Sequence, residues 1–263
     1  GKSVRWTGCA IERKNIYMNN KQKERKFALP KGPGPRSWKK SKRSFESKSD
    51  GAPVLRVIPL GGLNEIGKNM TVLEYGDDIL IIDCGIAFPD DEMLGIDLVI
   101  PDFSYLDDNS SKIRGIVITH AHEDHIGAVP YFLKSFDVPI YATRLTVGFI
   151  QNRLKEHSLQ GDLHVIAPGD VSKLGCFTIE AIHTTHSVAD ALCFSIDTPC
   201  GVVFHTGDFK IDYTPADGEP IDFGRLAQIG DKGVLLLMAD STNAGRKGYT
   251  ASETTVGVTL GNI

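Results

Sequence analysis

The chain has no long hydrophobic run. It has 263 residues, of which 41% are hydrophobic and 24% charged, as in ordinary globular proteins. Its longest apolar runs, such as Val234–Ala239, are far shorter than the roughly 20 residues that a membrane-spanning helix needs. No charged-then-apolar leader marks a secretory signal. We therefore expect a protein without membrane contact that works in the cytoplasm, with an organelle as the less favoured alternative.

Cysteine is scarce and scattered. The number of cysteines is odd and no C-x-x-C pair occurs, which argues against both a disulfide framework and a cysteine-based zinc site. We expect these side chains to act as small buried hydrophobic groups in a reducing compartment. The five cysteines are Cys9, Cys84, Cys176, Cys193 and Cys200.

Positive charge is concentrated at one end of the chain. Residues 1–50 contain 15 Lys and Arg against 4 Asp and Glu, whereas residues 51–263 contain 14 against 29. The first segment also lacks apolar periodicity, so we predict a basic, disordered leader over residues 1–51. A solvated tail without a partner and the remnant of an organelle transit peptide are alternatives. A weak candidate for contacts with nucleic-acid phosphates is the cluster Lys39, Lys40, Lys42 and Arg43.

Short β-type runs separated by Gly, Asp and Pro begin at Pro53. Strands outnumber helices, and the long apolar strands indicate sheets that are covered on both faces, an α/β (α+β) fold. Helices are predicted over Ala128–Ser135, Thr146–Lys155 and Phe223–Ile229. Strands are predicted over Val54–Leu60, Met70–Tyr75, Ile79–Asp83, Gly115–Thr119, Ile140–Ala142, Phe177–His183, Leu192–Asp197, Gly201–Thr206 and Val234–Asp240.

One predicted strand, Gly115–Thr119, runs directly into a sequence rich in metal-binding side chains, His120-Ala-His122-Glu-Asp124-His125. A turn after a strand allows neighbouring side chains to converge. His120 and His122 can bind one divalent ion, and Asp124 and His125 a second. Imidazole and carboxylate groups without sulfur suit zinc or a similar ion, and two such ions about 3.5–4 Å apart favour hydrolysis. A solvated charged turn is the alternative.

Further donors follow other strands. His186 comes after Phe177–His183 and can complete the first set, and Asp208 follows Gly201–Thr206 and can bridge the ions. Taken singly, each is equally consistent with a structural role. Asp83 ends a third strand and suits holding a ligand imidazole in one tautomer. We expect Asp124, Asp208 and His122 to take part in catalysis, with either Asp124 or Asp208 orienting the attacking water.

An acidic segment gives a weaker indication of a third ion. Hard oxygen ligands suit Ca²⁺, but a solvated acidic loop is the favoured interpretation. The weak calcium site near Asp90–Asp97 consists of Asp90, Asp91, Glu92 and Asp97, with Asp102 beyond it.

The histidine motif, with Asp83 upstream and His186 and Asp208 downstream, resembles the metallo-β-lactamase superfamily. Three further segments narrow the resemblance to the bacterial ribonuclease J family, in the β-CASP branch, from about Val54 onward. These segments are Gly61-Gly-Leu-Asn-Glu-Ile-Gly-Lys-Asn69, Phe88-Pro-Asp-Asp-Glu-Met-Leu-Gly-Ile-Asp97 and Asp240-Ser-Thr-Asn243.

The resemblance implies a four-layer αββα sandwich and two zinc ions, with Mn²⁺ or Mg²⁺ as possible substitutes. By resemblance, one zinc is bound by His120, His122 and His186. The other is bound by Asp124 and His125, with Asp208 bridging the two. Asp240 matches an acidic residue that lies near the site without binding the metal.

The resemblance also implies a function in RNA processing and decay. Family members are zinc-dependent ribonucleases that degrade RNA from its 5′ end and also cut internally. They form homodimers or homotetramers and can belong to RNA-degradation complexes. Residues 52–263 correspond to the first part of the metallo-β-lactamase domain and end near the start of the β-CASP insertion. We therefore expect this piece alone to expose strand edges and apolar faces and to be inactive.

Two other functions remain open. The same metal core could hydrolyse small esters, lactones or thioesters, although Asp240-Ser-Thr-Asn243 and the basic leader argue against this. The chain could also be an inactive RNA-binding fragment of the same fold, but the full set of donors argues against degeneration.

Overall fold

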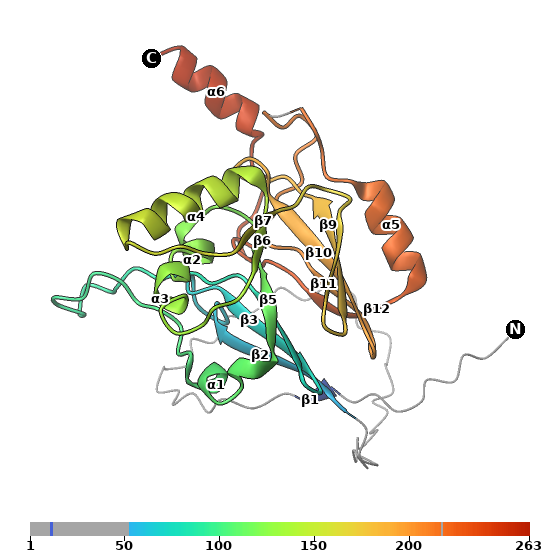
Figure 1. Cartoon of the computed structure of the whole chain (residues 1–263). Coiled ribbons are helices and arrows are strands. Elements are labelled where there is room, and N and C mark those ends of the chain that lie inside the picture. The colour runs from blue at the N-terminus through green and yellow to red at the C-terminus, as the bar shows by residue number, and fades with distance from the viewer. Residues whose placement is uncertain (1–10, 13–52, 217) are drawn as a thin grey trace, which may run out of the picture.

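The computed structural model describes residues 11–12, 53–216 and 218–263, and these form two packed sheets with helices outside them (Figure 1). The first sheet is antiparallel from β2 to β4 and parallel from β4 to β7. Its strand order is β1 (Ile11–Glu12), β2 (Leu55–Gly61), β3 (Met70–Tyr75), β4 (Asp78–Ile82), β5 (Ile113–Val117), β6 (Ile140–Ala142) and β7 (Leu163–Val165).

The second sheet is antiparallel except where β12 pairs parallel with β11. Its strand order is β12 (Val234–Met238), β11 (Gly201–His205), β10 (Leu192–Thr198), β9 (Phe177–His183) and β8 (Val171–Leu174). The two sheets face each other across a shared core in which Leu73, Val117, Phe177, Phe194 and Val203 are all buried. Alternating residues of the paired strands supply this layer, because successive side chains of a strand point to opposite faces.

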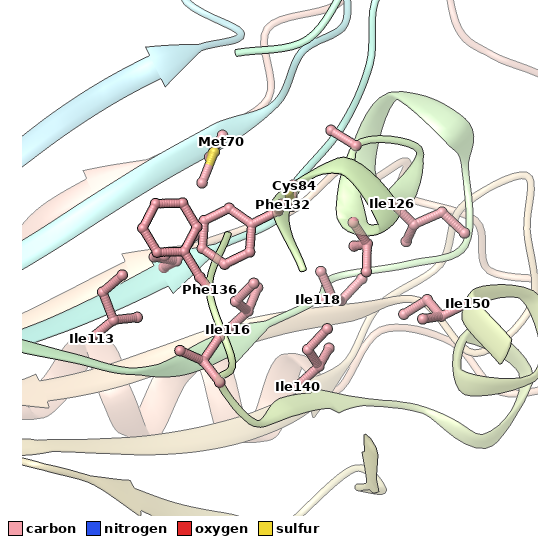
Figure 2. Close-up of a cluster of buried hydrophobic side chains, with 14 of the residues drawn as sticks. Met70, Cys84, Ile113, Ile116, Ile118, Ile126, Phe132, Phe136, Ile140 and Ile150 are labelled. Atoms are coloured by element: carbon pink, nitrogen blue, oxygen red, sulfur yellow. The ribbon is translucent and has the colours of Figure 1, made fainter. Parts of the chain in front are cut away.

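Four helices cover the outer face of the first sheet (Figure 1). The side chains between helices and sheet form one buried cluster, in which Met70 and Ile116 of the sheet meet Phe132 of α3 and Ile150 of α4 (Figure 2). The helices are α1 (Ser104–Asp107), α2 (Glu123–Ile126), α3 (Val129–Phe132) and α4 (Arg144–Glu156), and a 3₁₀ turn, η1, spans Ser110–Lys112.

A fourth layer covers the outer face of the second sheet. Helix α5 (Phe223–Lys232) packs Ile229 and Leu226 against Cys193 and Phe204 of that sheet. The predicted αββα sandwich is therefore confirmed. The last helix, α6 (Glu253–Gly261), has no buried residue among those described.

Apolar side chains are exposed at one edge of the second sheet and on the last helix. β12 lies at the edge of the second sheet, and its Leu235 and Leu237 side chains are 41% and 61% exposed. The apolar residues Val258 and Leu260 of α6 are exposed as well. Within the described residues, no helix is both long and apolar enough to cross a membrane.

The structure adds elements that the sequence did not predict: β1, β7, β8, α1, α2 and α6. Most are one turn or a few residues long, too short to show a period. β1 falls inside the segment predicted to be a disordered leader and pairs with β2 through Ile11 and Glu12. The basic cluster Lys39, Lys40, Lys42 and Arg43 lies outside the described residues, and the boundary at residue 51 stays a prediction.

The state of the cysteines agrees in part with the prediction of buried, unpaired thiols. Cys84 and Cys193 are buried and Cys176 is half-buried, and all three carry free thiols. Burial raises the pKa of the Cys193 thiol to about 12, which keeps it protonated and unreactive. Cys200 is disulfide-bonded, which corrects the expectation of a free thiol at that position. Spacing along the chain gives no information on such a pairing.

Candidate metal centre

The histidine motif forms at the end of β5, where the chain turns into the single-turn helix α2. His120 is fully buried, and His122 occupies the position before α2 with an extended backbone. This change of direction brings the two rings together, with His120 Nε2 and His122 Nδ1 3.1 Å apart. An uninterrupted strand would have kept the two side chains parallel, because residues two apart point the same way but do not converge.

A third imidazole reaches the same point from the second sheet. His186 lies in the loop after β9, and its Nε2 is 3.2 Å from His122 Nδ1. One nitrogen from each of His120, His122 and His186 lies within 4.8 Å of the other two. Burial lowers the pKa of both His120 and His186, and neighbouring imidazoles lower it further. Neutral rings with converging lone pairs are what a divalent metal ion requires.

A second group of donors lies beside the first and shares His120. It contains His120, His125 and Asp208, again with one ligand atom from each within 4.8 Å of the others. Asp208 follows β11, and its Oδ1 is 3.5 Å from His125 Nε2 while its Oδ2 is 3.8 Å from His186 Nε2. Its two oxygens therefore face both groups, as a bridging carboxylate would.

Asp124 is at the edge of the second group, and Asn69 fixes its position. Asp124 Oδ2 is 3.7 Å from His125 Nε2. The Asn69 amide Nδ2 donates to the Asp124 carbonyl at 3.1 Å and to Asp124 Oδ2 at 3.3 Å, and it lies 3.1 Å from His125 Nε2. The sequence prediction gave Asn69 no role. Asn69 is the last residue of the segment Gly61–Asn69, which was used only for the family resemblance. Its contact with Asp124 depends on how that segment folds onto α2.

Asp83 holds His125 from behind. It is buried, its backbone φ is +60°, and its Oδ2 lies 2.8 Å from His125 Nδ1. Its Oδ1 accepts a hydrogen bond from the Thr119 backbone N–H at 2.7 Å. Burial alone lowers the pKa of His125, but Asp83 and Asp208 outweigh it and raise that pKa to about 10, so an ion that binds at Nε2 must displace a proton from the ring. Asp83 therefore fixes the ring so that Nε2 faces the donor group.

Thr119 connects the two donor groups below the site, a role that the sequence prediction did not give it. Its Oγ1 lies 2.9 Å from Asp83 Oδ2, 2.9 Å from His120 Nδ1 and 3.3 Å from His125 Nδ1. One hydroxyl thus contacts the outer nitrogens of two candidate ligands. A threonine at the end of a strand gives no signal of this kind in the sequence.

Asp240 directly follows the end of β12 and lies near His186. Its backbone N–H donates to Thr206 Oγ1 at 3.0 Å, and its Oδ1 accepts from the Thr242 N–H at 2.7 Å. Its negative charge raises the pKa of His186 against the stronger effect of burial. The short turn Asp240–Thr242 thus keeps the carboxylate half-buried beside the first donor group.

The acidic loop is separate from this centre. The loop after the exposed Phe88 carries Asp90, Asp91 and Glu92. Asp102 instead accepts a hydrogen bond from the Ser104 N–H at the start of α1. Among the described residues, the two groups able to hold a metal ion both lie at the histidine motif. The structure therefore adds no support for a calcium site at Asp90–Asp97.

An ion pair joins the metal-binding turn to α4. Arg153 donates from Nε to Glu123 Oε1 at 2.9 Å, and its Nη2 contacts the same oxygen. Glu123 directly precedes Asp124. The sequence gave no signal for this pair, because the partners are 30 residues apart.

Comparison with known proteins agrees with the fold. Residues 63–247 match the metallo-beta-lactamase superfamily, and this match includes every candidate ligand. The chain belongs to that superfamily.

Within it, the chain is similar to proteins named ribonuclease J. It is 49% identical over 214 residues to the one from Synechocystis sp., covering 80% of this chain and 33% of the relative. It is 47% identical over 205 residues to the one from Helicobacter pylori strain 26695, covering 77% and 30%. The chain thus spans about a third of the length of these relatives.

A solved structure supports the fold alone. The crystal structure of a protein of unknown function from Enterococcus faecalis aligns with a TM-score of 0.57 at 19% identity. The alignment covers 74% of this chain and 52% of that one.

Proposed function

We propose that this chain forms the metal-binding part of a ribonuclease that hydrolyses phosphodiester bonds. The observation that carries the proposal is the convergence of His120, His122, His125, His186 and Asp208 into two adjoining donor groups. The similarity to ribonuclease J chains narrows the substrate to RNA.

The donor set divides between two divalent ions, preferably zinc, with Mn²⁺ or Mg²⁺ as substitutes. His120, His122 and His186 hold one ion. Asp124 and His125 hold the other, and Asp208 faces both. Bound ions of this kind lower the pKa of a coordinated water and withdraw charge from phosphoryl oxygens.

The protein's own residues position the reacting groups. Asp124 and Asp208 are 30% and 29% exposed, whereas His125 is only 2% exposed, so the carboxylates form the accessible side of the centre. Either carboxylate can accept a hydrogen bond from the attacking water and orient it. Asp83 and Asn69 hold His125 and Asp124 from the protein side, so these ligands need little reorganisation.

The details of the activity are inferred from the similarity to the ribonuclease J chains. We infer 5′–3′ exonuclease and endonuclease action in RNA processing and decay, in the bacterial cytoplasm, by a homodimer or homotetramer within an RNA-degradation complex. We assign phosphate contacts to the basic cluster Lys39, Lys40, Lys42 and Arg43 on its charge alone. Residues 51–263 carry a net negative charge, so RNA needs further positive surface beyond the few basic residues of this part.

Two other functions make different predictions. A hydrolase of small esters, lactones or thioesters would turn over those substrates and leave RNA intact. An inactive RNA-binding module would bind RNA without zinc and without cleavage.

A digestion of 5′-monophosphorylated RNA by the full-length protein, with its metal content measured, tests the proposal. We expect about two zinc ions per chain and a loss of cleavage in His122→Ala that leaves RNA binding intact. His164→Ala is the matched control, because His164 is exposed and stacks on Tyr141, away from the motif. Cleavage by His122→Ala at the wild-type rate would contradict the assignment.

A further inference from the structure

A hollow of about 590 Å³ lies between α4 and the loop after β9. Arg144, Gly148, Phe149 and Asn152 line it from the helix, and Asp190 lines it from the loop. The hollow is shallow and open to solvent along one side, so it suits a flexible strand lying across it better than an enclosed small ligand. We call this hollow, which Leu145 and Gln151 of the helix also line, the α4 groove.

The α4 groove uses the face of the helix that points away from the core. Val147, Ile150 and Leu154 are buried and face the first sheet. Residues 144, 148 and 152 follow the spacing of four that places side chains on one face of a helix. The ring of Phe149 is 47% exposed, although an aromatic side chain of this size is usually mostly buried.

Three features place the α4 groove beside the metal centre. β5 and β6 are parallel neighbours, so their carboxyl ends, which lead to His120 and Arg144, meet at one edge of the sheet. Asp190 is four residues from His186 in the same loop, which limits their Cα separation to about 14 Å. The Arg153–Glu123 ion pair ties α4 to the turn that carries Asp124.

The chemistry of the α4 groove fits one nucleotide of a single strand. An exposed aromatic ring can stack on a base. A guanidinium can pair with a phosphate, and the Asn152 amide can donate to and accept from a base edge. We propose that the α4 groove binds a nucleotide of single-stranded RNA next to the cleaved bond, with its base on Phe149 and a phosphate at Arg144. This inference rests on the proposed ribonuclease function.

Gly148 offers a substitution that fills the groove without disturbing the core. A Cβ built at Gly148 meets no atom within 4 Å, so Gly148→Leu projects into the hollow. Gly230 on α5 provides a matched control, because a Cβ there also meets nothing within 4 Å and α5 covers the other sheet. Both glycines lie within helices.

The experiment measures the Kd of a labelled, cleavage-resistant phosphorothioate single-stranded RNA for the metal-loaded full-length protein by fluorescence anisotropy. We expect Gly148→Leu and Phe149→Ala to raise the Kd about fivefold or more. Phe149→Trp and Gly230→Leu should stay within twofold of the wild type. The zinc content of all four variants should match that of the wild type, which shows that the metal centre and the fold are intact.

Two results would overturn the proposal that the α4 groove binds RNA. One is a Kd within twofold of the wild type for both Gly148→Leu and Phe149→Ala, and the other is a wild-type protein that does not bind the RNA. Failure of the proposed function is a separate result, namely a wild-type protein that binds RNA with its metal present and does not cleave it.

Discussion

Asp83 and His125 are 42 residues apart in sequence, and their side chains meet at 2.8 Å beneath the metal centre, where both are 2% exposed. The carboxylate contacts the ring nitrogen that faces away from the other donors. This geometry makes Asp83 a determinant of how His125 presents its Nε2.

Asp83→Asn should weaken metal binding by about 10- to 100-fold, because an amide orients the ring less firmly and removes the negative charge that makes the imidazole a stronger ligand. Zinc competition against a chelating dye measures the effect. Asp102→Asn is the control, since Asp102 lies at the start of α1 and contacts the Ser104 N–H instead. Equal zinc affinity in Asp83→Asn and the wild type would contradict this role.

Glu123→Gln should lower zinc affinity or cleavage by about tenfold, because it weakens the link that holds α2 against α4. Arg153→Met should act in the same way, and the double variant should be no worse than either single one. Glu156→Gln is the matched control, as Glu156 is an exposed partner of the same arginine at 3.2 Å. A Glu156→Gln defect as large as that of Glu123→Gln would show that Arg153 acts only through surface charge.

Gly85→Ala should abolish metal binding or folding. A Cβ at Gly85 would lie 1.5 Å from the Asp124 carbonyl oxygen, so the segment that follows Asp83 could no longer pack on α2. Overpacking of this kind costs about 1–3 kcal/mol or more. Gly230→Ala is the control, and it should leave the thermal midpoint unchanged or raise it, because alanine favours a helix. Thermal unfolding with zinc titration distinguishes the two variants.

Glu74 should make the fold sensitive to acid. Burial alone raises the pKa of Glu74, but Tyr105, Lys112 and Arg56 outweigh it and hold that pKa below its usual value. The carboxylate therefore contributes stability above its unfolded pKa, and this contribution is lost as the pH falls through the lower folded value. Urea unfolding between about pH 5 and pH 3 should show a shallower loss of stability in Glu74→Gln than in the wild type. Glu92→Gln, in the exposed acidic loop, should follow the wild-type curve.

The apolar runs predicted sheets covered on both faces and the strand ends that carry donors, because these are local signals, whereas the αββα sandwich came from the resemblance to a known family. His186 and Asp208 were found since each directly follows an apolar strand. Asn69 and Arg153 were missed, because their roles come from the packing of Gly61–Asn69 and α4 on a single-turn helix. Such contacts depend on tertiary structure, and no periodicity in the chain records them.

The candidate ligands come from both sheets. His120 and His122 follow β5 of the first sheet, whereas His186 and Asp208 follow β9 and β11 of the second. An ion held by all three histidines of the first group would join the two layers as a cross-link does. Separating the sheets would then require release of the ion, so the unfolding rate should depend on free zinc concentration. The centre would thus hold the two sheets of the sandwich together as well as form its reactive site.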